Sequence, residues 1–454
     1  MLLRAAAMLV ALSSFLLIPG IRAGAALPVK PNIVLILADD MRAIDVPLMP
    51  QVTALANHGV MFTNGFVSTS LCCPSRSGIL TGQYSHNTKV YDNVAPTGGV
   101  TAFNDTSTVA TWLKGAGYST SLMGKYFNEY DTLPQSFVPP GWTDWHAIAT
   151  GTKYPVYYDY TLNENGVLNH FGSSPSDYLT DVLASRAYDF VKGAPGPFFL
   201  SFNPFAPHYP STPGPGDVVP TTPLPRPPSF NEADVSDKPW GTTVPQMTDA
   251  QITTMTTYYQ NQLATLQSLD RAVGRIVQGL QERGVLENTV IVFTSDNGMM
   301  FGEHRIWNKI WPYDPSVRVP MVWRLPGDAN AGKKVDSRFV MQVDLAYTFA
   351  QLAGVTPPIK QNGLSLVPLL NGQTPAWRTG VYSEFLGKKQ NAAFPLRFSG
   401  FRTSQYKLII YENGTREFYD LASDPQELKN VANDPAYDAA EASVETKLRQ
   451  QQKA

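Results

Sequence analysis

The chain has 454 residues, a formal net charge of -2 and 2 cysteines. This length accommodates one large α/β core with a smaller appendage, and the cysteine count excludes a disulfide-rich scaffold. The near-neutral charge gives no electrostatic basis for binding nucleic acid or an acidic membrane surface.

Residues 1–26 are predicted to be a signal peptide. Arg4 precedes an apolar stretch, and small residues stand at Ala23 and Ala25, as before an export cleavage site. An uncleaved anchor is the alternative, because the apolar stretch approaches membrane-spanning length. Pro19 favours cleavage, since it breaks the helix near that site. We expect a secreted or periplasmic mature protein with no membrane segment after signal cleavage.

Short apolar runs after the leader predict strands that are buried on both faces. They cover residues 32–38, 118–124, 197–204 and 289–298. Helical patterns lie between them, and the longest covers about residues 249–283. This alternation predicts an α/β fold with a large, mostly parallel sheet flanked by helices on both faces.

The pattern changes in two later segments. Residues 205–247 are rich in proline and are predicted to form a long surface excursion. From about residue 376, short strands joined by turns precede a helix near 437–452. We therefore expect a catalytic α/β domain over 27–375 and a C-terminal subdomain, an antiparallel sheet plus a helix, over 376–454.

Polar residues follow two of the predicted strands. Asp39 and Asp40 end the first, and Asp296 and Asn297 end the last. Either pair alone is weak support for a site, because Asp and Asn often cap helices and form turns. Ligands do gather at the carboxyl ends of strands in open α/β sheets, however, and these oxygen donors suit Ca²⁺ or Mg²⁺ better than zinc.

The two cysteines, Cys72 and Cys73, are adjacent in the chain. Neighbouring Cα atoms lie about 3.8 Å apart, which is too close for ordinary disulfide geometry. Pro74 can occupy the first turn of a helix through "SRSGILTG", whose free N–H groups would face an anion. Arg76 lies one turn into that helix. The C-x-P-x-R spacing selects Cys72 rather than Cys73.

The segment "CCPSRSGILTG" resembles the motif of the formylglycine-dependent sulfatase family, within the alkaline phosphatase superfamily. In that motif a dedicated formylglycine-generating enzyme oxidises the first cysteine to an aldehyde. "NIVLILADD", "APHYP", "TSDNG" and "YDPSVRVP" follow the family's order, and "GKYFNEY" and "PPGW" are most similar to the branch of N-acetylglucosamine-6-sulfatases and heparan sulfate 6-O-endosulfatases.

The resemblance implies a metal centre and a nucleophile. Formylglycine derived from Cys72 would be hydrated, and one hydroxyl would attack sulfur in line, with the metal and Arg76 stabilising the alkoxide. The implied Ca²⁺, or alternatively Mg²⁺, would be held by Asp39, Asp40, Asp296, Asn297 and an oxygen of modified Cys72.

The resemblance also assigns residues that contact the substrate. Lys125 and Lys309 match sulfate-contacting lysines, and His208 matches a substrate-side histidine, for which we hypothesise protonation of the leaving alcohol. Many arylsulfatases have a histidine two residues after the first lysine, as the base that triggers sulfate release, whereas here Phe127 takes that place. His86, on the helix that starts at Pro74, is the replacement candidate and His304 the second choice, although either could be a structural histidine.

Two other functions stay open at this point. One is a phosphomonoester or phosphonate hydrolase on the same scaffold, and the other is a catalytically inactive protein that binds sulfated glycans. The expected substrate is a 6-sulfated glucosamine or an aryl sulfate. Residues 205–247 contain only Arg226 and Lys238 as basic residues, which favours an exo-acting enzyme or a small substrate over an endosulfatase.

Overall fold

The computed structural model describes residues 27–149, 157–327, 334–388 and 397–454. The signal peptide predicted for residues 1–26 lies outside these ranges. Within them, no helix is both long and apolar enough to cross a membrane.

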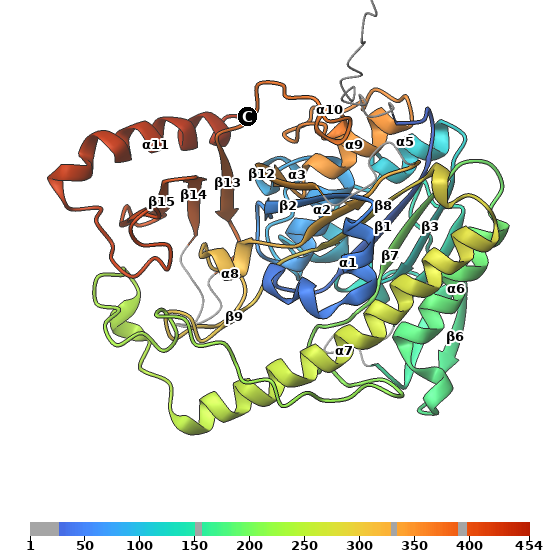
Figure 1. Cartoon of the computed structure of the whole chain (residues 1–454), viewed down its shortest axis with the longest axis horizontal. Helices are drawn as coiled ribbons and strands as arrows, with labels where there is room; N and C mark the ends of the chain where they lie inside the picture. Colours follow the sequence, from blue (N-terminus) through green and yellow to red (C-terminus); the bar gives the residue numbers. More distant parts are fainter. Residues whose placement is uncertain (1–26, 150–156, 328–333, 389–396) are drawn as a thin grey trace, which may run out of the picture.

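A ten-stranded sheet forms the centre of the molecule (Figure 1). Five neighbouring strands at its middle run parallel, while antiparallel pairs lie toward both edges. The predicted mostly parallel α/β fold is confirmed. From edge to edge the strands are β12 (Lys334–Met341), β2 (Gly59–Phe66), β11 (Met321–Arg324), β8 (Thr289–Ser295), β1 (Asn32–Ala38), β7 (Phe198–Asn203), β3 (Ser119–Gly124), β4 (Asp144–Ile148), β5 (Tyr160–Glu164) and β6 (Val167–Phe171).

Strand β1 shows why the sheet is covered on both faces. Its side chains alternate between two hydrophobic clusters, so that Ile33 and Leu35 belong to one and Val34 and Ile36 to the other. One cluster includes residues of α2 (Cys72–Thr81), α5 (Val109–Gly115) and α9 (Asp344–Leu352). The other includes residues of α1 (Pro50–Ala56), α6 (Leu179–Gly193) and α7 (Asp249–Glu282). Both predicted helical layers are therefore present.

The longest helix, α7, matches the pattern predicted over 249–283. A capping box begins it, in which the Thr248 side chain accepts a hydrogen bond from the backbone N–H of Gln251. Its apolar face, which includes Leu263 and Ile276, packs against the sheet and α6. In the preceding segment 205–247, the only helical turn is η4 (Gly241–Thr243), as expected for a surface excursion.

A second, four-stranded sheet lies beside the first, as predicted for the C-terminal region. Its strands are antiparallel neighbours in chain order, and α11 packs across β14 and β15 (Figure 1). The elements are β13 (Gly380–Phe385), β14 (Phe398–Thr403), β15 (Tyr406–Tyr411), β16 (Arg416–Asp420) and α11 (Asp438–Gln452). Short helices elsewhere are α3 (Ser85–Thr88), α4 (Gly99–Ala102), α8 (Asp314–Val317) and α10 (Val367–Leu370).

Buried charges join the small sheet to α8. Lys407 on β15 is 2% exposed and forms ion pairs with Asp314 at 3.1 Å and Glu427 at 2.6 Å. Arg402 on β14 also pairs with Asp314, at 3.0 Å. Burial raises the pKa of Asp314, but Lys407 and Arg402 outweigh it and hold that pKa well below its usual value. This network ties the small sheet to α8, which precedes β11 of the large sheet.

The variant Lys407→Met should destabilise the protein, because the buried Glu427 and the partly buried Asp314 would each lose a partner. We expect a loss of about 3–5 kcal/mol in the free energy of unfolding, measured by chemical denaturation. Lys429→Met is the matched control, since Lys429 is exposed and its change should cost less than about 0.5 kcal/mol. Equal stability of the two variants would contradict the role of the network.

Candidate functional site

The site begins where β1 and β8 end side by side. Ala38 pairs with Ser295 in parallel register, which brings the two acidic segments together. The backbone N–H of Asp40 donates to Asp296 Oδ1 at 3.2 Å, and Asn297 Nδ2 donates to Asp40 Oδ1 at 2.5 Å. The two polar clusters predicted from the sequence therefore form one buried group.

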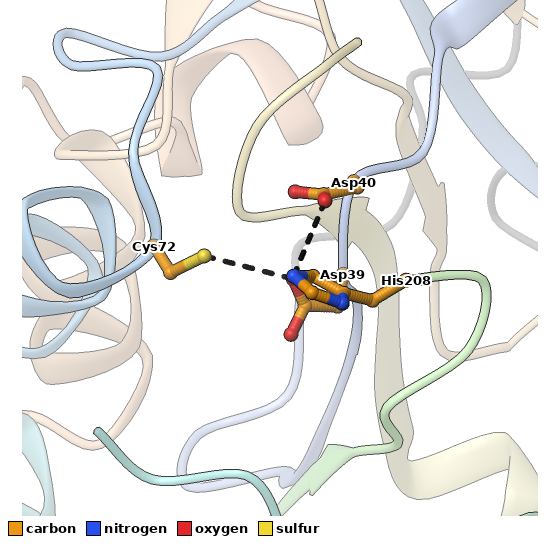
Figure 2. A group of neighbouring side chains, drawn as sticks. All are labelled: Asp39, Asp40, Cys72 and His208. Atoms are coloured by element: carbon orange, nitrogen blue, oxygen red, sulfur yellow. Dashed lines mark hydrogen bonds and ion pairs between the residues drawn. The ribbon is translucent and has the colours of Figure 1, made fainter. Parts of the chain in front are cut away.

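Helix α2 brings Cys72 to this group (Figure 2). The sequence predicted a helix from Pro74, but α2 begins at Cys72, with Leu71 in extended conformation as its N-cap. Pro74 still lies within the first turn, where its missing N–H costs nothing. Cys72 is 1% exposed, and its Sγ lies 3.7 Å from Asp39 Oδ1. Burial raises the pKa of the Cys72 thiol.

Arg76, one turn further along α2, contacts two of the acidic residues through its guanidinium group. Its Nε donates to Asp296 Oδ2 at 2.9 Å and its Nη2 to Asp39 Oδ2 at 3.3 Å. Its Nη1 donates to the backbone carbonyl of Lys125 at 2.8 Å. In this structure Arg76 thus positions the carboxylates and the Lys125 loop.

Two lysines complete the charge cluster. Lys125 follows β3, and its Nζ lies 2.6 Å from Asp39 Oδ2. Lys309 follows the short strand β10 (Trp307–Asn308), and its Nζ lies 2.5 Å from Asp40 Oδ1 and 2.9 Å from Cys72 Sγ. Both side chains are almost fully buried, so neither is an ordinary solvated lysine.

The carboxylates of the cluster differ in their proton affinity. Burial raises the pKa of Asp39, but Lys125 and the neighbouring cations outweigh it and hold this pKa well below its usual value. Burial, followed by repulsion from Asp39, raises the pKa of Asp296 to about 6. Burial lowers the pKa of Lys309, yet Asp40 and the other acidic groups hold it well above its usual value. The raised pKa of Asp296 indicates that Arg76 alone does not offset the negative charge buried around this carboxylate.

His208 approaches from the loop after β7 (Figure 2). Its Nε2 lies 3.5 Å from Asp40 Oδ2, and its Nδ1 lies 2.7 Å from the Tyr209 carbonyl. A carbonyl only accepts hydrogen bonds, so Nδ1 holds a proton and Nε2 is the atom that gains or loses one. Burial lowers the pKa of His208.

Four side chains of this site could share a metal ion. One ligand atom from each of Asp39, Asp40, Cys72 and His208 lies within 4.8 Å of the others. The predicted ligand set differs, because it contains Asp296 and Asn297 in place of His208. Asp296 Oδ2 faces Arg76, whereas Asn297 Oδ1 is buried and has no hydrogen-bond partner. An unpaired buried carbonyl oxygen beside carboxylates fits a hard cation such as Ca²⁺.

The other two candidate histidines lie in different surroundings. His86 is on the separate helix α3 rather than on the helix of Cys72, because Gly82 ends α2 in a left-handed conformation (φ 74°). Its Nδ1 pairs with Glu384 of β13 at 3.0 Å. His304 Nδ1 pairs with Glu232 at 2.6 Å. No hydrogen bond or ion pair found among the described residues links either histidine to the Cys72 cluster.

Phe127 occupies the position where many arylsulfatases have a histidine. It is buried and stacks on Phe103, with ring centroids 4.5 Å apart, and packs edge-on against Tyr126 at 4.7 Å. This place in the chain is therefore part of the hydrophobic core. The side chain is aimed at other aromatic rings instead of at the charge cluster.

Comparison with known proteins shows the family of the chain. The model of the family described as "Sulfatase" matches residues 31–355, and that of "N-sulphoglucosamine sulphohydrolase, C-terminal" matches residues 302–454. The chain belongs to the sulfatase family. This places it among the sulfuric ester hydrolases.

The chain is similar to curated relatives and to solved structures. An extracellular sulfatase homolog of Caenorhabditis elegans is 36% identical over 75% of the chain, which spans only 49% of that relative. Human N-acetylglucosamine-6-sulfatase is 34% identical over 81% of the chain and 69% of its own length.

A solved protein in complex with its substrate D-glucosamine-2-N,6-O-disulfate has a TM-score of 0.79 and 26% identity, covering 93% of this chain and 98% of its own. The phosphonate monoester hydrolase of Agrobacterium radiobacter has a TM-score of 0.73 at 23% identity, covering 93% and 95%, and therefore shares the fold.

The sequence does not predict some of the residues at this site. Tyr258 of α7 lies close enough to Asp40 and Lys309 for their charges to act on it. Asn93 and Asn128 hold the second cysteine: Asn93 Oδ1 accepts from the Cys73 N–H at 2.8 Å, and the Asn128 N–H donates to Cys73 Sγ at 3.3 Å. No local pattern marks such residues, because they reach the site only through the fold.

Cys73 is consequently a packing residue of the sulfatase motif. It is fully buried, and burial, followed by the neighbouring Cys72, raises its pKa to about 12. Its sulfur links α2 to the loop that begins at Lys125. The two adjacent thiols thus have separate environments, because Cys72 Sγ lies beside Asp39 and Lys309 whereas Cys73 Sγ contacts the Asn128 N–H.

Cys73 should resist alkylation in the native protein, because a buried thiol with this pKa supplies almost no thiolate at pH 8. We expect iodoacetamide to leave it unmodified under native conditions and to alkylate it fully in denaturant. Mass spectrometry of the peptide that ends at Arg76 measures both states. Rapid native labelling of Cys73 would contradict its assigned burial.

Proposed function

We propose that the protein hydrolyses sulfate monoesters, with a formylglycine derived from Cys72 as nucleophile and a bound Ca²⁺. The observation that carries this proposal is the charge balance of the site. Three carboxylates, those of Asp39, Asp40 and Asp296, face three cations, those of Arg76, Lys125 and Lys309.

That balance has a consequence for anion binding. Without a further cation, the buried groups are neutral overall and offer a sulfate ester no net attraction. A divalent cation would give the cluster a net charge of about +2, which suits an anionic substrate in a site shielded from water. The same cation would relieve the repulsion that raises the pKa of Asp296.

Ca²⁺ would be held by oxygen donors of Asp39, Asp40, Asp296 and Asn297. It would supply Lewis-acid stabilisation of the nucleophile and of a sulfate oxygen. Mg²⁺ suits the same donor atoms but demands stricter octahedral geometry. Oxidation of Cys72 would replace the one soft ligand of the group with oxygen, and thereby make the donor set uniformly hard.

The remaining residues have roles that follow from their positions. Lys125 and Lys309 are placed to neutralise charge on the sulfate oxygens, since each ends beside the group that contains Cys72. His208 can carry a transferable proton at Nε2, while the Tyr209 carbonyl fixes its orientation through Nδ1. We assign His208 to protonation of the leaving alcohol. His86 and His304, the candidates for the base that triggers sulfate release, pair with Glu384 and Glu232.

The relatives support proposals about the substrate and the cellular location. The named N-acetylglucosamine-6-sulfatase and the solved complex with a 6-O-sulfated glucosamine support a 6-sulfated glucosamine as the substrate. The extracellular sulfatase homologs and the predicted signal peptide support export from the cytoplasm. Conversion of Cys72 would require a formylglycine-generating enzyme as a maturation partner.

A phosphonate or phosphate ester hydrolase is the second candidate. The neighbour from Agrobacterium radiobacter supports it through the fold alone. The third possibility, an inactive glycan-binding protein, is disfavoured because each charged residue of the cluster is present and paired.

The decisive test is mass spectrometry of the tryptic peptide ending at Arg76, taken from protein purified from its native host. We expect Cys72 as an aldehyde or its hydrate, and turnover of N-acetylglucosamine 6-sulfate that is lost in Cys72→Ala. Cys73→Ala, which leaves the nucleophile in place, is the matched control. Two plain thiols in protein that still cleaves esters would reject this mechanism.

A thermal-shift measurement tests the metal separately from activity. Calcium should stabilise the wild-type protein by about 2.7 kcal/mol at 100 times its Kd. In Asp296→Asn this calcium-dependent shift should largely disappear, because a carboxylate ligand is lost. Asp189→Asn, on the exposed face of α6, should keep the full shift. A shift that survives in Asp296→Asn would remove Asp296 from the ligand set.

A further inference from the structure

Two exposed aromatic side chains stand beside the charge cluster. Tyr209 is 51% exposed and Trp307 is 40% exposed. In the described parts of the chain, no other Phe, Tyr or Trp side chain is as exposed as these two. Tyr209 directly follows His208, and Trp307 precedes Lys309 by two residues. Their position next to the site is therefore unlike that of a scattered surface residue.

A third ring connects these two side chains to the site. Tyr258 lies between them, with its ring centroid 5.8 Å from that of Tyr209 and 5.7 Å from that of Trp307. Burial mainly raises the pKa of Tyr258, and the charges of Asp40 and Lys309 also act on it. The three rings therefore form a row in which the buried Tyr258 contacts the two exposed rings.

The backbone holds this row in place. Trp307 lies on β10, where it pairs with Phe301 of β9 (Met300–Phe301) in an antiparallel ladder. The Phe301 ring packs against Tyr258 with centroids 5.6 Å apart. Tyr258 is only 8% exposed and accepts a hydrogen bond from Gln262 on the next turn of α7. The two exposed rings thus rest on a fixed support.

The charged and aromatic parts of the site suit the two ends of one substrate. A sulfate group at Lys309 and His208 would leave the rest of the ester at the open edge of the cluster, where His208 is 20% exposed. Ligand sites commonly combine a few charged groups with an aromatic wall. We propose that Tyr209 and Trp307 form a platform that binds the sugar ring of a sulfated monosaccharide. This inference rests on the proposed function.

The solvent exposure of Tyr209 and Trp307 favours a sugar over an aryl group as the part of the substrate that the platform binds. A pyranose ring has apolar C–H faces and polar hydroxyl groups at its edge, so one face can pack on aromatic rings while its hydroxyls stay in water. An aryl ring is apolar throughout and gains most from an enclosed slot. Tyr209 and Trp307 remain half exposed, which matches the first case.

Steady-state kinetics of Trp307→Ala and Tyr209→Ala test the platform. For N-acetylglucosamine 6-sulfate we expect KM to rise roughly three- to tenfold in each variant, with a smaller change in kcat. For ethyl sulfate, which has no ring, kcat/KM should stay within about twofold of wild type, because no stacking is lost. Trp307→Phe should restore most of the affinity, and Val167→Ala, an exposed change on the distant strand β6, is the control.

A binding measurement separates the platform from catalysis. Calorimetry of N-acetylglucosamine 6-sulfate with Cys72→Ala, and with Cys72→Ala combined with Trp307→Ala, needs no turnover. Weaker binding in the double variant supports the platform even if the wild type cleaves no sulfate ester, an outcome that would reject the proposed function alone. Equal binding would overturn the platform. So would an equal loss with ethyl sulfate, or a larger loss with 4-nitrophenyl sulfate than with the sugar.

Discussion

The site depends on the burial of three carboxylates at the ends of β1 and β8. Each unpaired carboxylate in such a place would be strongly unfavourable, and the cations from α2 and from the loops after β3 and β10 offset this cost. Arg76 contacts both Asp39 and Asp296, so that one side chain joins two strands and a helix. The sheet, the helix and the two lysine loops therefore hold one another in position through charge as well as through packing.

Pairing of buried charges with opposite charges also distinguishes the small sheet from the apolar core. In the core, alternation along β1 sends side chains into two apolar clusters, and the buried carboxylates Asp39, Asp40 and Asp296 follow the ends of β1 and β8. At the small sheet, Lys407 and Arg402 form a second buried ionic network around Asp314. One network holds reactive groups together, and the other orients a subdomain against the catalytic sheet.

How far the sequence predicts this structure depends on the range of the interactions. The buried runs of β1 and β8 and the periodicity of α7 are local, so their elements were predicted within a residue or a few at each end. The start of α2 was missed by two residues, because a proline in the first turn is compatible with more than one start. Tyr258 and Trp307 come together with Tyr209 only through tertiary contacts, which no sequence window contains.

The burial of Cys72 sets an order of events in the life of the chain. With 1% of its surface exposed and its helix packed against the strand ends, Cys72 offers no room for a second protein to grasp the residues around it. Under the proposed function, an enzyme that converts Cys72 would have to reach this side chain before α2 packs against the sheet. Folding and conversion of Cys72 would then compete in time.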